Sequence, residues 1–139
     1  MTRRTSRRSG FTLLEVMLVL AILVVMGSSV TYYFVGAQQK ANTRQAISQI
    51  SMLEDMLTAY HMDVGSYPST SQGLAALRTS PPELANTNIW QGPYAAKEIP
   101  PDPWRNPYQY ELAAADQYMI WSWGPDQQNG TEDDIRNTQ

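Results

Sequence analysis

The stretch FTLLEVMLVLAILVVMGSSVTYYFVGAQQ, residues 11–39, carries one charged side chain, Glu15, close to its start. The following 24 residues, 16–39, are uncharged, which exceeds the roughly 20 residues that a helix needs to cross a bilayer. Four arginines precede the apolar run: Arg3, Arg4, Arg7 and Arg8. Because positive flanks stay in the cytoplasm, we predict a single membrane-spanning helix with a cytoplasmic N-terminus and an exported remainder.

A secretory signal peptide is the alternative for this stretch, but the run is longer than a typical signal core and no A-x-A-like site ends it. A small residue, Gly10, stands before the run instead. Cleavage there would create an α-amine on Phe11, four residues before Glu15. A carboxylate in hydrocarbon costs a few kcal/mol and needs a partner. We therefore predict that Glu15 neutralises the Phe11 amine of a neighbouring subunit and fixes the register of assembly.

The segment SGFTLLE, residues 9–15, resembles the class III signal sequence of type IV pilins and type II secretion pseudopilins. The resemblance implies that a membrane peptidase cuts after Gly10 and N-methylates Phe11. It divides the chain into a leader at 1–10, a transmembrane assembly helix at 11–36 and a periplasmic head at 37–139. The family usually has a proline within the apolar helix where this chain has Tyr32. In the family, that proline is associated with local melting of the helix in assembled fibres, and the resemblance does not extend to this position.

Beyond the apolar run the sequence becomes polar, but helical periodicity continues over 37–64. Apolar residues recur every three or four positions, which predicts a one-sided stripe of Ala46, Ile47, Ile50, Leu53, Leu57, Tyr60 and Val64. Gly65 and Pro68 are stop signals, so we expect one helix from Phe11 to about residue 64. The single histidine, His61, is interpreted as a surface or packing residue without a partner.

Residues 66–107 hold eight of the nine prolines, and we predict a long ordered loop region over 65–107 with one short helix in STSQGLAAL. Tyr108, Tyr110 and Leu112 alternate with polar residues, and QYMIWSW follows after a turn, which predicts an antiparallel hairpin within 108–139. The expected class is α+β, with a pilin-like fold in which a long helix packs on a small sheet.

Two further segments, YPSTSQGLAALRTSP and GPYAAKEIPPDPWRNPYQYE, together with the acidic tail, resemble the G class of type II secretion pseudopilins. This similarity runs over nearly the whole chain. Typical type IV pilins have a C-terminal disulfide loop, which this cysteine-free chain cannot form. The absence of cysteine therefore favours the pseudopilin.

The segment WGPDQQNGTEDDIR, residues 123–136, gathers carboxylates that could bind a hard cation, although the spacing is not that of an EF-hand. On residue pattern alone, a solvated acidic tail is the simpler interpretation. The resemblance instead implies one bound calcium ion. Matched by position, its candidate ligands are the side chains of Asp126, Thr131, Asp133 and Asp134 and the backbone carbonyl of Trp123, with Glu132 less favoured.

Charge and composition limit the other functions. The formal net charge is −3, and the chain after Gly10 has six basic and thirteen acidic residues, which disfavours nucleic acid. Without cysteine and with one histidine, thiolate and His-rich zinc sites within one chain are excluded. No G-x-S-x-G or nucleotide-binding sequence occurs, so we expect no catalytic residues.

The resemblance implies a structural subunit that polymerises with itself into a periplasmic fibre and helps to export folded proteins across the outer membrane. Its implied partners are minor pseudopilins, the prepilin peptidase, the inner-membrane platform with its ATPase, and lipid before assembly. Two alternatives remain open. One is a type IV pilin or competence pseudopilin, and the other, from a different class, is a membrane-anchored calcium-binding module, which could include an enzyme.

Overall fold

The computed structural model describes residues 10–84 and 87–137 of the 139-residue chain. Its elements are one α-helix, α1 (Leu13–Val64), two 3-10 helices, η1 (Gly73–Leu77) and η2 (Thr87–Ile89), and three strands, β1 (Gln109–Ala114), β2 (Gln117–Ser122) and β3 (Ile135–Arg136). The chain divides into two compact units at Gln38/Gln39. From here on we use the word head for residues 39–139, in place of the range 37–139 taken from the sequence. The predicted leader lies outside the described residues except for Gly10, and so does the side chain of Tyr32.

Helix α1 confirms the expectation of one continuous helix. Its 52 residues contain no proline, and it ends where Gly65 adopts a φ of +84° and donates its amide to the His61 carbonyl at 2.8 Å. Glycine is the residue that takes this left-handed conformation without steric cost. Within the described residues, no helix meets the combined length and hydropathy that a membrane span requires.

The core of the head lies along one stripe of α1, where Ala46, Ile50, Leu53, Leu57 and Tyr60 are buried. Their spacing alternates between four and three residues, as expected for a single helical face. Ile47 was predicted to belong to this stripe, and that prediction is wrong: its side chain is 50% exposed. Met56 and Val64 beside this stripe are partly buried against the same core.

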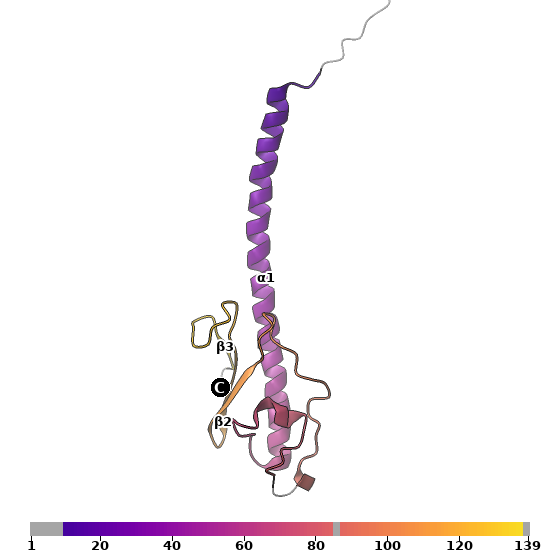
Figure 1. The fold of residues 1–139 in the computed structure, drawn as a ribbon, viewed down its shortest axis with the longest axis vertical. Helices are drawn as coiled ribbons and strands as arrows, with labels where there is room; N and C mark the ends of the chain where they lie inside the picture. Colours follow the sequence, from indigo (N-terminus) through magenta and orange to yellow (C-terminus); the bar gives the residue numbers. More distant parts are fainter. Residues whose placement is uncertain (1–9, 85–86, 138–139) are drawn as a thin grey trace, which may run out of the picture. The chain divides into compact units, whose positions relative to one another are not determined.

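The sheet has the order β1-β2-β3 and is antiparallel throughout. Figure 1 shows β2 and β3 beside the C-terminal part of α1. In β2, Tyr118, Ile120 and Ser122 are buried in alternation, as the period of two in a strand requires. The predicted hairpin is confirmed, whereas β3, which pairs Ile135 with Ser122, was not predicted.

The long connection between α1 and β1 is anchored to the core at several points. Leu77 of η1 is fully buried, and its carbonyl accepts hydrogen bonds from the Tyr94 and Ala95 amides at 2.8 and 3.0 Å. The Tyr110 hydroxyl donates to the Pro68 carbonyl at 2.8 Å, and burial raises the pKa of Tyr110. These contacts hold a proline-rich segment in place with little regular secondary structure.

His61 does have partners in the structure, which corrects the interpretation of it as unpaired. Its Nε2 atom lies 3.7 Å from Asp116 Oδ1 in the β1–β2 turn, and its ring lies 4.5 Å from the ring of Tyr67. The Asp116 side chain is 85% exposed, so the pair is a weak surface contact. A packing role for His61 accounts for both contacts.

Candidate functional site

The start of α1 places the predicted processing and assembly residues together. Gly10 and Phe11 precede the helix, and Phe11 is 80% exposed. Thr12 is the N-cap residue: its Oγ1 accepts the Glu15 amide at 3.3 Å, and its carbonyl accepts the same amide at 3.1 Å. Thr12 and Glu15 therefore have the spacing of a capping box, T-x-x-E. The cap was missed in the sequence, although this spacing signals it.

Glu15 consequently has a local role as well as the predicted assembly role. A carboxylate in the first turn is stabilised by the positive end of the helix dipole. The helix dipole therefore explains, within a single chain, why a carboxylate is favourable at this position. It does not account for the surface that follows, because residues 13–26 expose their large apolar side chains on all sides of the helix.

The predicted calcium loop connects β2 to β3. It turns three times through left-handed backbone conformations, at Gly124 (φ +69°), Gln127 (φ +58°) and Gly130 (φ +87°). Gly124 also lies against the far end of the loop, since an added Cβ atom would be 2.1 Å from the Asp133 carbonyl oxygen. Only glycine permits this approach, so the two ends of the loop are packed together.

The candidate ligands are distributed along this loop. Asp126 Oδ1 accepts the Gln128 amide at 3.0 Å, and Thr131 Oγ1 donates to the Gln128 carbonyl at 3.4 Å. Asp134 Oδ2 accepts the Gly130 amide and the Arg136 guanidinium, both at 2.9 Å. Asp133 has an exposed side chain. Sequence reasoning missed Arg136, which pairs with a candidate ligand.

Whether this loop suits calcium depends on its free oxygen atoms. The Asp134 side chain is 1% exposed, and its Oδ1 atom is buried without a hydrogen-bond partner among the described residues. A buried polar atom in this state is costly unless something binds it. In the described part of the chain, no three side chains of His, Cys, Asp or Glu converge on a metal position. The loop therefore supplies oxygen donors of the type that hard cations bind but does not bring them together, and Asp134 is the candidate ligand with a buried, unsatisfied oxygen atom.

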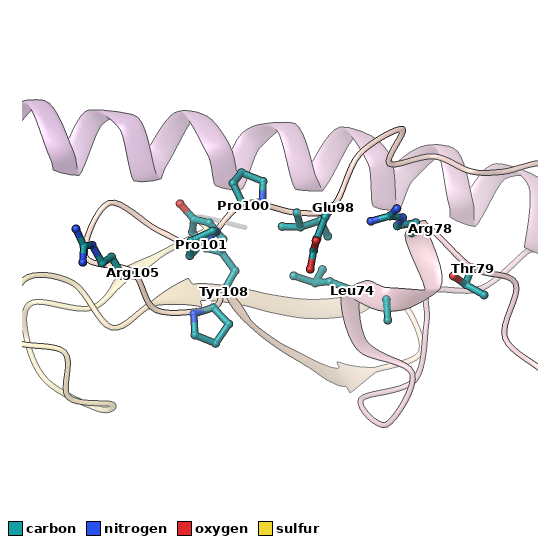
Figure 2. Close-up of a pocket in the computed structure, with 11 residues that line it drawn as sticks. Leu74, Arg78, Thr79, Glu98, Pro100, Pro101, Arg105 and Tyr108 are labelled. Atoms are coloured by element: carbon teal, nitrogen blue, oxygen red, sulfur yellow. The ribbon is translucent and has the colours of Figure 1, made fainter.

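A separate cavity of about 490 Å³ lies in the head (Figure 2). Apolar and proline side chains make up much of its wall, including Leu74, Pro100 and Tyr108. Arg105 lies toward one end and Arg78 toward the other (Figure 2). Tyr108 belongs to the predicted strand pattern, but no pattern in the sequence indicated this cavity.

Two family models match the chain. "Type II secretion system (T2SS), protein G" matches residues 33–138, and "Prokaryotic N-terminal methylation motif" matches residues 5–31. The type II secretion system core protein G of Aeromonas hydrophila is 41% identical over 134 residues, covering 94% of this chain and 92% of that protein. The protein of the same name from Escherichia coli K12 is 42% identical over 139 residues, covering 97% and 94%.

A solved structure is similar as well. It is that of the major pseudopilin from the type 2 secretion system of enterohaemorrhagic Escherichia coli, with a TM-score of 0.64 and 34% sequence identity. The match covers 74% of this chain and 91% of that chain.

Proposed function

The chain belongs to the type II secretion system protein G family and is a major pseudopilin subunit, and on this premise we propose that its mature subunits polymerise into a periplasmic fibre. The fibre helps to drive export of folded proteins across the outer membrane. The N-terminal helix supplies the contacts between subunits, and the head forms the outer surface. The subunit is structural, and we propose that it catalyses nothing.

The observation that carries this proposal is the exposed apolar surface of α1 over residues 13–26, with Glu15 as its one charge. An apolar surface on all sides of a helix must be covered by lipid or by other helices. We propose that the inner membrane covers it first, with the N-terminus in the cytoplasm and the head in the periplasm. Neighbouring subunits then cover it in the fibre.

The remaining proposed partners act while the subunit is processed in the membrane and assembled into the fibre. A prepilin peptidase removes residues 1–10 and methylates Phe11. The inner-membrane platform and its ATPase move subunits into the fibre. Minor pseudopilins contact this subunit through its N-terminal helix. The match of residues 5–31 to an N-terminal methylation motif supports cleavage and methylation by the peptidase. The match to type II secretion system protein G favours a secretion fibre over a pilus.

We expect the protein purified from membranes of cells that contain the peptidase to start at N-methyl-Phe11. Intact mass and N-terminal sequencing measure this, with peptidase-deficient cells as the control, in which residues 1–10 are retained. A chain that starts beyond Val35 would contradict the proposal, because the helix carrying Glu15 would have been removed.

We also propose that the loop between β2 and β3 holds one calcium ion. Asp126, Thr131, Asp133, Asp134 and the Trp123 carbonyl would hold it. The ion would supply positive charge to the buried Asp134 side chain, whose Oδ1 atom has no hydrogen-bond partner in the described part of the chain. Arg136 already neutralises part of this charge through Oδ2. Calcium that binds only the folded head stabilises it by mass action.

At a calcium concentration of 100 times the Kd, this stabilisation is about 2.7 kcal/mol, so we expect the melting temperature to rise by about 10 °C or more. Calorimetry of the full chain in detergent, with EDTA or with calcium, measures the shift. Asp134→Asn should remove most of the shift, whereas Glu132→Gln, an exposed neighbour that is not a proposed ligand, should keep it. An unshifted wild-type protein would refute the calcium proposal.

A further inference from the structure

Asp102 is a buried carboxylate that organises a tight turn. Its residue is 3% exposed, and its Oδ1 atom accepts the amides of Trp104 at 3.0 Å and Asn106 at 2.7 Å. The backbone closes the same turn, since the Asp102 amide donates to the Asn106 carbonyl at 2.8 Å and the Arg105 amide donates to the Asp102 carbonyl at 2.9 Å. Arg105 takes a φ of +75° within this turn.

The other oxygen of Asp102 faces β2. Asp102 Oδ2 accepts the hydroxyl of Ser122, which is fully buried at the end of β2. The Ser122 Oγ atom in turn accepts the Gly124 amide at 3.1 Å. A continuous line of hydrogen bonds therefore runs from the 102–106 turn through Ser122 to Gly124. We call Asp102 and Ser122 the buried latch.

The latch reaches both ends of the loop between β2 and β3, residues 123–134, which we call the acidic loop. Gly124 begins the loop, and its backbone packs directly against the Asp133 carbonyl near the loop's end. Fixing Gly124 therefore constrains the segment that contains Asp133 and Asp134. The acidic loop and the 102–106 turn are joined by this buried contact although they are about 20 residues apart in the chain.

Burying a carboxylate is costly unless hydrogen bonds compensate for the lost water. Among the described residues, no cationic side chain pairs with Asp102, so its charge is held by two amides and one hydroxyl. Its charge also contributes, after burial, to raising the pKa of Tyr108. Losing the hydroxyl leaves Oδ2 without its donor in a buried position, which makes this bond a strong link.

We propose that the buried latch couples the order of the acidic loop to that of the 102–106 turn, with Asp102 as a positioning residue for the loop. The calcium part of this inference rests on the proposed function. Since coupling between two sites is reciprocal, calcium in the loop stabilises the turn, and an intact latch strengthens calcium binding by the same factor. Arg105 of that turn also lines the cavity in Figure 2.

The test is amide hydrogen exchange on the full chain in detergent, in EDTA and in calcium, for the wild type and Ser122→Ala. In EDTA, we expect the Gly124, Gln128 and Gly130 amides of Ser122→Ala to exchange roughly tenfold faster, as for loss of one hydrogen bond to a charged group. Calcium affinity should fall by about the same factor. In the wild type, calcium should slow exchange at Trp104 and Asn106, and in Ser122→Ala it should not.

Two further variants sharpen this test. Asp102→Asn perturbs the latch from the opposite end and should also speed exchange in the acidic loop. Ser69→Ala is the matched control, because Ser69 Oγ accepts the Gln72 amide at 3.3 Å and lies outside the latch. It should leave the loop amides at wild-type rates.

Each result separates the latch from the calcium proposal. Wild-type exchange rates at the loop amides of Ser122→Ala in EDTA would overturn the latch, whether or not calcium binds. If the wild type binds no calcium but Ser122→Ala loosens the loop, the latch stands and the calcium proposal fails. Equal calcium affinities in the wild type and Ser122→Ala would overturn the coupling.

Discussion

Replacing Leu57 with alanine is expected to lower the free energy of unfolding of the head by about 2–5 kcal/mol. Leu57 is 0% exposed and belongs to the core cluster that joins α1 to η1 and the sheet. Truncation removes buried apolar contacts and leaves a cavity within this core cluster. Since a domain is stable by about 5–15 kcal/mol, this loss is a large share of the total. Urea unfolding of the full chain in detergent measures it.

Ile47→Ala is the matched control for this prediction, because Ile47 lies on the same helix and has a similar side chain but is 50% exposed. We expect the control to lower stability by less than about 1 kcal/mol. Similar losses for the two variants would mean that α1 buries a wider face than the structure shows.

Local pattern was sufficient to predict the main elements of the head. The spacing of three and four along α1 and the alternation in β1 and β2 are properties of the neighbouring sequence, so the helix and the hairpin could be predicted. The position of Ile47 could not, because which edge of an apolar stripe is covered depends on what packs against it. The strand β3 consists of two residues, Ile135 and Arg136, too short for any alternation.

The candidate sites show the same division. Thr12 and Glu15 are three residues apart, so their capping interaction is readable from sequence. The candidate calcium ligands came from resemblance, since acidic residues alone did not distinguish a binding loop from a solvated tail. Asp102 and Ser122 are 20 residues apart and meet only in the folded head. No pattern in the sequence joins them.

Replacing Glu15 with glutamine is expected to abolish fibre formation while leaving the subunit folded. Glutamine can also occupy this position of a capping box, so the start of α1 keeps its local hydrogen-bonding capacity but loses the charge. In the proposed fibre, the Phe11 amine of the neighbouring subunit would then be buried without a counter-charge. Breaking a buried pair in this way costs about 3–5 kcal/mol, which lowers an association constant more than a hundredfold. The measurement is the yield of sheared fibres at equal subunit levels.

Thr12→Val is the control that makes the reverse change. It removes the Oγ1 atom that caps the Glu15 amide but keeps the Glu15 charge. Loss of an N-cap costs about 1 kcal/mol of helix stability, so we expect fibres close to the wild-type yield. If Thr12→Val is as defective as Glu15→Gln, the carboxylate acts through the helix start and not through a neighbour. If Glu15→Gln assembles normally, the charge has no role in assembly. The comparison therefore separates the proposed pairing of the Glu15 carboxylate with the next subunit from the local contact at the start of α1, where Thr12 caps the Glu15 amide.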